Sequence, residues 1–262
     1  MTLPRALSSL NTDISTRVKQ LAIALPLTLL ASSTLTPAQA IEFPDTGDRG
    51  APSSTAGGGT RGGWCEEEIT WADTSLLALA PKINVITFAG DQASLWLHSS
   101  DIFENRTAEI FVQDAQTKDV IYETQLQLEG LEPGKFIKVD LPSTAATGAP
   151  LLEKGKLYTW EFAIICSTGD RTQDYFVNGL LESVTPSPAL TTQLATATPA
   201  EKAELYANAG IWQETLMLAE QLSTAMPTLL PNLLKSVGLE AITQPQTIET
   251  NPDTYSTEEG TV

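Results

Sequence analysis

Between residues 64 and 184 the apolar residues recur in short runs, and in most runs they alternate with polar residues. Side chains two residues apart share one face of a β-strand, so this alternation indicates half-buried strands. Gly, Asp, Asn and Pro separate the runs, which is typical of an antiparallel sandwich or barrel. The predicted strands are Val85–Phe88, Ala93–His98, Ala108–Gln113, Val120–Leu128, Phe136–Val139, Leu157–Cys166 and Tyr175–Leu181.

One predicted strand begins with a motif of defined spacing. Leu152 lies six residues before Tyr158, and Gly155 lies three residues before it. This spacing resembles the tyrosine corner of immunoglobulin and fibronectin III domains, in which the Tyr hydroxyl bonds to the backbone upstream. The predicted fold class is therefore α+β: a mainly antiparallel, immunoglobulin- or fibronectin III-like β-sandwich, followed by a C-terminal helical hairpin.

The residues after Val184 lose the strand pattern. Residues 185–197 have the composition of a linker. Thr198 and Glu201 have the spacing of a capping box, which predicts a helix that Gly210 ends. The stretch around this glycine is similar to the turn of a single tetratricopeptide unit, and one unit cannot stack into a solenoid. We expect a hairpin that packs on the sandwich or on a partner, with helices up to Asn208, over Ile211–Ser223 and, shorter, over Leu229–Val237.

The N-terminus has the features of a cleavable secretory signal. Basic residues precede the apolar run Leu21–Leu30, and Ala38-Gln39-Ala40 follows it as a cleavage motif. The run is shorter than the ~20 residues that span a membrane. We predict residues 1–40 to be a signal peptide cleaved after Ala40, and a periplasmic or secreted product with no transmembrane span. An uncleaved signal anchor is the alternative.

The net charge limits which classes of partner the protein can bind. The formal net charge is −17, and removing residues 1–40, with three basic residues and one acidic, makes it −17 − 2 = −19. A chain this acidic repels nucleic acid and anionic lipid. The acidity favours solubility, with attraction of cations or of a basic partner as the alternative. Residues 41–63 and 241–262 are predicted to be a disordered lead-in and a disordered acidic tail.

The two cysteines, Cys65 and Cys166, both follow the predicted signal. In an oxidising compartment an even pair usually bonds, so we predict a Cys65–Cys166 disulfide. Two separate buried thiols are the alternative.

Candidate chemistry is sparse. His98, the single histidine, has no nucleophile placed beside it. Paired carboxylates can hydrolyse glycosides or hold calcium, but no spacing here forces two acids together. We predict no catalytic, cofactor-binding or metal-binding residue, with calcium as the one alternative ligand. Trp96, on the strand face opposite Leu95 and Leu97, and Trp212 are the candidate surface aromatics. Trp96 could meet a ligand if its sheet face is open, but we expect the helical hairpin to cover that face, because apolar faces are usually buried.

Several segments in combination resemble a known family. They are Gly57–Gly62 ahead of a cysteine, Leu76–Pro81, Glu109–Asp114, the strand that begins Gly155–Trp160 and ends in Cys166, and Tyr206–Trp212. This combination resembles the domain of unknown function 928 family of exported cyanobacterial proteins, over about residues 57–240. The resemblance implies export and no particular activity. The segment Leu95–His98 departs from the family pattern, which is more aromatic there.

These observations predict an exported, non-enzymatic protein-interaction or structural module of the cell envelope, with another envelope protein bound through the helical hairpin. The alternative is an envelope polysaccharide-binding or carboxylate-dependent hydrolytic domain. A calcium-stabilised envelope protein is the third possibility. The expected organisation is a β-sandwich over 64–184, a linker over 185–197 and the helices over 198–240.

Overall fold

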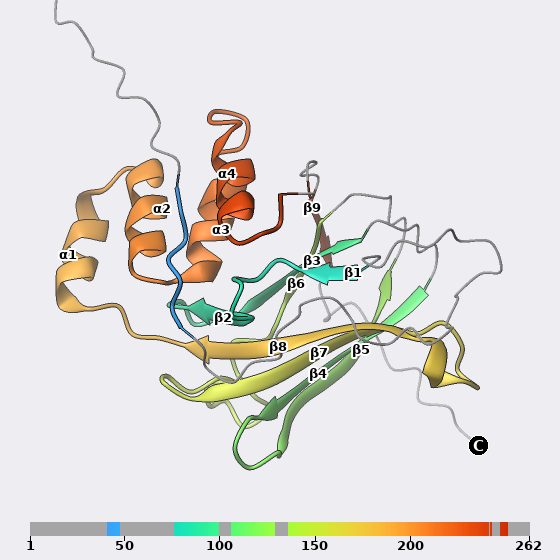
Figure 1. Cartoon of the computed structure of the whole chain (residues 1–262). Coiled ribbons are helices and arrows are strands. Elements are labelled where there is room, and N and C mark those ends of the chain that lie inside the picture. The colour runs from blue at the N-terminus through green and yellow to red at the C-terminus, as the bar shows by residue number, and fades with distance from the viewer. Residues whose placement is uncertain are drawn as a thin grey trace, which may run out of the picture. The chain divides into compact units, whose positions relative to one another are not determined.

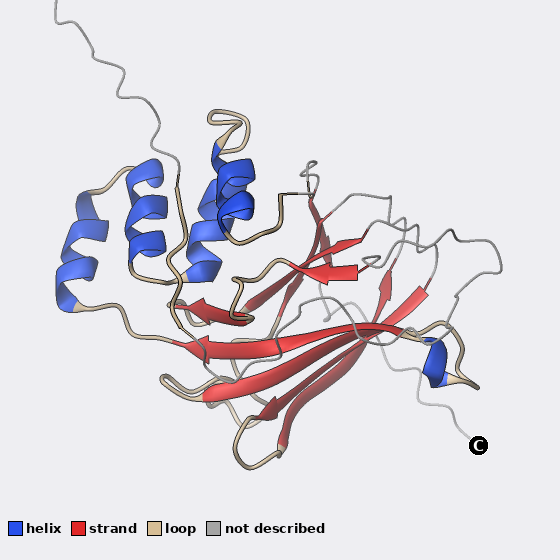
Figure 2. Ribbon diagram, in the orientation of Figure 1, coloured by secondary structure: helices blue, strands red, loops and turns tan. Residues whose placement is uncertain are grey.

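The computed structural model describes residues 41–47, 76–99, 106–128, 136–240, 242 and 247–250. These residues all belong to one compact unit. They form two mostly antiparallel β-sheets and four α-helices, which confirms the mixed α+β class. Figures 1 and 2 show the helices gathered at one end of the sheets. The predicted signal peptide lies outside the described residues.

The larger sheet has the strand order β2-β8-β7-β4-β5. Its neighbours are antiparallel except β2 and β8, which are parallel. Each of its strands was predicted from the short apolar and alternating runs of the sequence, with ends that differ by no more than two residues. The strands are β2 (Val85–Phe88), β4 (Arg106–Asp114), β5 (Val120–Leu128), β7 (Leu157–Ile164) and β8 (Tyr175–Ser183).

The smaller sheet has the order β1-β3-β6-β9. Two of its strands differ from the prediction. β1 is too short to show a period in the sequence, and β9 lies in the tail that was predicted to be disordered. β9 pairs in parallel with β6 alone, through backbone groups that any polar sequence supplies. The strands are β1 (Leu76–Ala78), β3 (Ser94–Ser99), β6 (Phe136–Asp140) and β9 (Thr247–Thr250).

The core takes side chains from both sheets. In β4 buried Ala108, Ile110 and Val112 alternate with partly exposed residues, as expected of a strand with one solvated face. Leu95 and Leu97 of β3 join the same apolar cluster. Strand β3 is buried on both faces for most of its length.

Four helices follow the last strand of the larger sheet. Thr198 and Glu201 form the predicted capping box of α2, and Gly210 ends the turn before α3 with φ +68°. Residues 188–196, predicted as part of a linker, form α1 instead, because Ser187 caps the amide of Leu190 and Pro188 begins the helix. The helices are α1 (Pro188–Thr196), α2 (Pro199–Asn208), α3 (Trp212–Gln221) and α4 (Leu229–Ser236).

Side chains from the first turn of α3 form hydrogen bonds with the backbone between β2 and β3. Glu214 Oε1 accepts hydrogen bonds from the amides of Ala89 and Gly90, both at 2.9 Å. Gln213 Oε1 accepts from the amide of Ser94 at 2.7 Å, and its Nε2 donates to the carbonyl of Gln92 at 3.0 Å. We call these four bonds the α3 clamp. They provide hydrogen-bond partners for backbone groups that, in an exposed loop, would bond to water instead.

Thr87 and Trp212 add further hydrogen bonds between the start of α3 and the strands. The Thr87 hydroxyl accepts from the amide of Trp212 at 3.0 Å and donates to the carbonyl of Gly210 at 2.6 Å. The indole Nε1 of Trp212 donates to the carbonyl of Leu79 at 2.7 Å. Edge strand β2 is therefore covered by a helix, which protects its edge from pairing with another chain.

Residues 41–47 pack against the helices, although they were predicted to belong to a disordered lead-in (Figure 1). Ile41 and Phe43 are 5% and 7% exposed. The Phe43 ring meets the Trp212 ring edge-on, with centroids 5.0 Å apart, and its amide donates to Ser236 Oγ at 3.0 Å. Burial of two large apolar side chains is enough to dock a short segment.

The motif around Tyr158 adopts a corner. The amide of Glu153 donates to the Tyr158 hydroxyl at 2.9 Å, Leu152 is buried, and Gly155 has φ +75°. Beside it, Lys156 Nζ lies 2.7 Å from the carboxylate of Asp114, whose side chain is 3% exposed. The amides of residues 116 and 117 also donate to this carboxylate.

We expect Glu214→Ala to lower the free energy of unfolding by about 2 kcal/mol, because two amides lose a charged acceptor. The matched control is Glu204→Ala, which removes an exposed carboxylate from α2. Urea denaturation of both variants measures the difference. Equal stability of the two variants would contradict the clamp.

Acid should remove the contribution of Asp114. Its pKa is lowered from 3.8 to about 2, first by the bond from Lys156 and then by backbone amides. A lowered folded-state pKa stabilises the fold above the unfolded value, and that stability is lost as pH falls from about 4 towards 2. In urea melts, Asp114→Asn should unfold more easily at pH 6 but lose less stability across that window than the parent. Asp119→Asn, in the same turn, serves as the control. A parent-like pH dependence for Asp114→Asn would be the opposing result.

Candidate functional site

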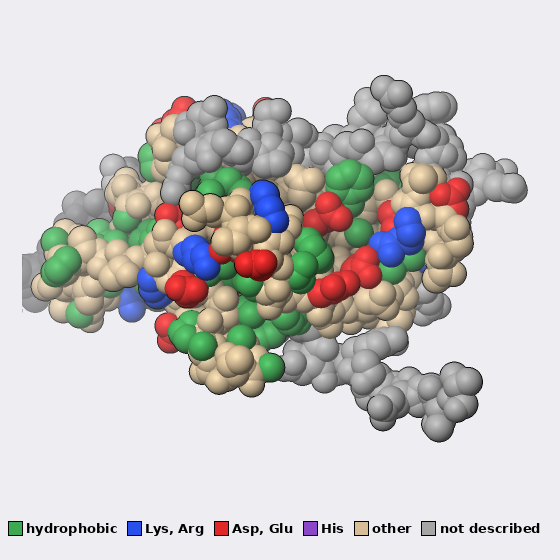
Figure 3. All heavy atoms as spheres, turned by 90° about the horizontal axis from the view of Figure 1, so that it is seen from below, with side chains coloured by type: hydrophobic (Ala, Val, Ile, Leu, Met, Phe, Trp, Pro, Cys, Tyr) green, Lys and Arg blue, Asp and Glu red, His purple; other side chains and the backbone are tan. Residues whose placement is uncertain are grey.

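The outer face of the larger sheet carries an aromatic ring between carboxylates. Phe111 of β4 pairs with Glu123 of β5 on one side and with Glu161 of β7 on the other. Directly opposite side chains lie on the same face, about 5 Å apart at Cβ. Glu123 and Glu161 are exposed and Phe111 is partly exposed. Figure 3, which views the molecule from below, shows acidic, basic and apolar side chains together on this face.

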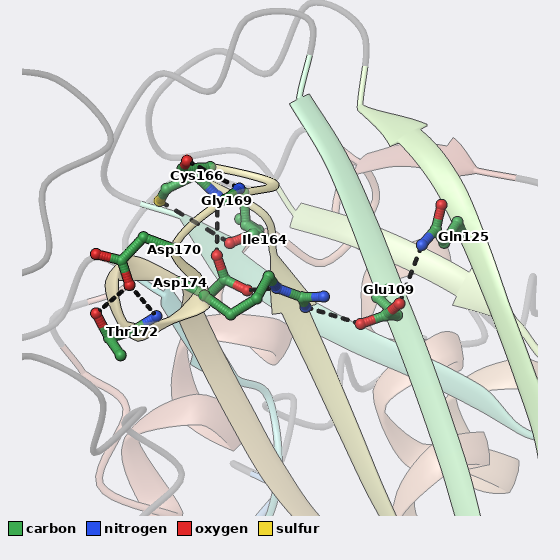
Figure 4. A network of polar contacts seen from close by, with 10 residues as sticks. Glu109, Gln125, Ile164, Cys166, Gly169, Asp170, Thr172 and Asp174 are labelled. Carbon is green, nitrogen blue, oxygen red and sulfur yellow. Dashed lines mark hydrogen bonds and ion pairs between the residues drawn. The ribbon is translucent and has the colours of Figure 1, made fainter.

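Glu109, two residues before Phe111, links this face to the connection between β7 and β8 (Figure 4). Its carboxylate lies 2.8 Å from Arg171 Nη2 and accepts from Gln125 Nε2 at 3.0 Å. Arg171 also pairs through Nε with Asp174, whose side chain is 6% exposed. We call these four side chains (Gln125, Glu109, Arg171 and Asp174) the Arg171 network. It ties β5 and β4 to the loop that follows β7.

The loop itself is held by further bonds to acidic side chains. Asp174 Oδ1 accepts from the amide of Cys166 at 3.0 Å. Asp170 caps the short 3₁₀ helix η1 (Arg171–Gln173) by accepting from the amide and hydroxyl of Thr172. These bonds fix the loop beside the sheet face, so a ligand on this face would meet a preorganised rim.

The carboxylates of this face have different proton affinities. The pKa of Glu109 is lowered, chiefly because Arg171 and Gln125 donate to its carboxylate. The pKa of Glu161 is raised, first by desolvation and then by the negative charge of Glu109. Two acids on adjacent strands whose environments shift them in opposite directions can act as a proton donor and an ionised partner.

The predicted surface aromatics are buried. Trp96 and Trp212 are 4% and 1% exposed, so neither candidate is a surface aromatic. Trp212 packs under the N-terminal segment, and Trp96 lies in the doubly buried strand β3, with Lys138 Nζ 5.9 Å from its ring centroid. The apolar face of α3 is likewise turned to the core, where Leu216 and Ala219 are fully buried.

His98 lies beside an aromatic ring in the smaller sheet. Its ring centroid is 6.1 Å from that of Phe136, in an edge-on arrangement. Burial lowers its pKa, which favours the neutral imidazole. Its position in the smaller sheet fits a packing role.

Cys166 lies in the connection between β7 and β8, and no cysteine within the described ranges is free. Cys65 lies outside them, so the Cys65–Cys166 disulfide stays a prediction. Among the described residues, no group of three or more His, Cys, Asp or Glu side chains is placed to hold a metal ion. None of the helices within those ranges combines the length and apolar character of a membrane span.

The sequence prediction missed Phe111, Glu161 and Arg171. Alternation along β4 already placed Phe111 and Glu109 on one face, which was the available signal. The partners of that face depend on strand order and register, because Arg171 and Glu109 are 62 residues apart.

Comparison with known proteins places the chain in a family. No curated protein matches it significantly. A family model described as Domain of Unknown Function (DUF928) matches residues 56–247, which cover most of the sequence. The resemblance seen in the sequence segments is thereby confirmed: the chain belongs to the DUF928 family.

Proposed function

We propose that the protein is an exported, non-enzymatic module of the cell envelope with an immunoglobulin-like sandwich. Its outer face on the larger sheet binds a basic segment of another envelope protein. The observation that carries this proposal is Phe111 between the exposed carboxylates Glu123 and Glu161.

Strand order supports the immunoglobulin-like assignment. In immunoglobulin domains strands A, B and E share one sheet, and G, F, C and C′ form the other. The orders β1-β3-β6 and β8-β7-β4-β5 match these two sets in sequence order. Tyr158 lies at the start of β7, where strand F carries the tyrosine corner, and its hydroxyl accepts from the amide of Glu153.

The chemistry of the face suits Lys or Arg side chains. A cation placed over the Phe111 ring gains a cation–π interaction, and the alkyl part of either side chain covers the ring. Glu123 and Glu161 lie on the two sides of the ring and can pair with the charge. A formal charge of −17 for the whole chain adds long-range attraction for a basic partner.

Export rests on the order of basic, apolar and small residues before Ile41. The packed segment Ile41–Phe43 begins immediately after the predicted cleavage point. Cleavage there would leave the whole segment available to dock on the helices.

Binding can be tested with a fluorescent deca-arginine peptide. We expect Glu161→Gln and Phe111→Ala each to weaken binding by about threefold or more, because each removes one contact to the guanidinium groups. Glu153→Gln is the matched control, since it removes the same charge from a side chain that is 70% exposed at the tyrosine corner. Fluorescence anisotropy at fixed ionic strength measures the affinities.

Equal weakening by Glu161→Gln and Glu153→Gln would show that only net charge matters, and the proposed site would be wrong. Crosslinking of the exported protein in intact cells, followed by mass spectrometry, extends the test to the natural partner. Crosslinks from β4, β5 and β7 to basic segments are the expected result.

The opposite pKa shifts of Glu109 and Glu161 favour one second function, carboxylate-dependent hydrolysis of an envelope polysaccharide. Here Glu161 would donate the proton and Glu109 would stay ionised. Release of reducing ends from purified envelope polysaccharide, abolished in Glu161→Gln and retained in Glu153→Gln, would replace the binding proposal with this one.

A further inference from the structure

The two sheets have four edge strands, which differ in how well they are protected from pairing with another chain. Edge strand β2 is covered by α3 through Thr87 and the α3 clamp. Edge strands β1 and β9 are three and four residues long. Edge strand β5 is nine residues long, and in the described part of the chain β4 is its one strand partner (Figure 1).

The β5 sequence lacks the usual protection of a free edge. Natural proteins block long edges with Lys, Pro, bulges or a covering segment. Strand β5, VIYETQLQL, contains no Lys and no Pro, and Glu123 is its single charged residue. The register irregularity opposite Val112 and Gln113 affects only its first residues, so Tyr122–Leu128 pairs regularly with β4.

We propose that β5 pairs antiparallel with β5 of a second copy of this chain, which would join the two larger sheets into one continuous sheet. Side-chain alternation limits the register, because opposite residues must point to the same face. Placing Gln125 on the two-fold axis meets this condition. Glu123 then lies opposite Gln127 of the second copy, and Gln127 lies opposite its Glu123.

This register makes the strand complementary to itself on both faces. On the outer face, amides oppose an amide and a carboxylate, so hydrogen bonds can form and no like charges meet. On the inner face, Leu126 opposes Thr124, and Leu128 opposes Tyr122. Leu126 and Leu128 are 3% and 1% exposed, so the sandwich core would continue to the junction.

The net charge predicts how salt should act. Two copies of the exported chain, each with a formal charge of −17 − 2 = −19 after removal of residues 1–40, repel each other, and salt screens that repulsion. Self-association should therefore strengthen as salt is added, whereas association with a basic partner should weaken. The proposal is argued from the edge of β5 and not from the partner-binding function, with which it shares Glu123.

Sedimentation velocity of the purified exported chain, over a range of concentrations and salt, tests the self-association. We expect a weak monomer–dimer equilibrium that salt favours. Gln127→Lys should tighten it about threefold or more, since Lys would oppose Glu123, and Gln127→Glu should weaken it similarly. The matched controls, Gln116→Lys and Gln116→Glu, change the same charges on an exposed turn and should leave the charge-dependent difference small.

A second variant tests the register directly. Opposite Cα atoms in an antiparallel pair lie about 4.5–5.5 Å apart, which a disulfide can bridge. Gln125→Cys should therefore form a covalent dimer on a non-reducing gel, and Gln116→Cys should not. A monomer at every concentration up to the solubility limit, or equal shifts from the Gln127 and Gln116 variants, would overturn the proposal. So would failure of Gln125→Cys to crosslink more than Gln116→Cys.

Discussion

The bonds between the first turn of α3 and the β2–β3 connection determine how the helices and the sheets form one unit. Glu214 and Gln213 together bind two amides and one carbonyl of that connection and the amide of Ser94, the first residue of β3. From the other side, Lys154 Nζ donates to the carbonyls of Ala89 and Gly90. Because α3 and Lys154 both hold the connection, edge strand β2 stays covered. The exposed carboxylates Glu123 and Glu161 lie on the outer face of the same sheet, on β5 and β7.

Much of the fold could be predicted from local patterns. The alternation in Val120–Leu128 and the spacing of Leu152, Gly155 and Tyr158 each correspond to a local structure, as does the capping box at Thr198. Helix α1 was missed because its composition of Thr, Ala and Pro lacks a strong apolar period. Residues 41–47 were misjudged because the partners of Phe43 are Trp212 and Ser236, far along the chain.

The candidate site depended on information that local patterns do not hold. Periodicity placed Glu109 and Phe111 on one face of a strand but could not identify their neighbours across the sheet. Alternation shows that a strand has two faces and does not show whether both are covered, so the sequence could not decide between a surface position for Trp96 and a covered one. The sheet order supplies what was missing, since it brings Glu123, Glu161 and Arg171 around one strand.

Native-state hydrogen exchange of the Ala89, Gly90 and Ser94 amides tests the central role of the α3 clamp most directly. These amides lie in or beside a turn, where exchange is fast unless an acceptor protects them. The account predicts slow exchange, with the same dependence on denaturant as the amides within α3, and faster exchange of Ala89 and Gly90 in Glu214→Ala. Rapid exchange of these amides while α3 stays protected would contradict it.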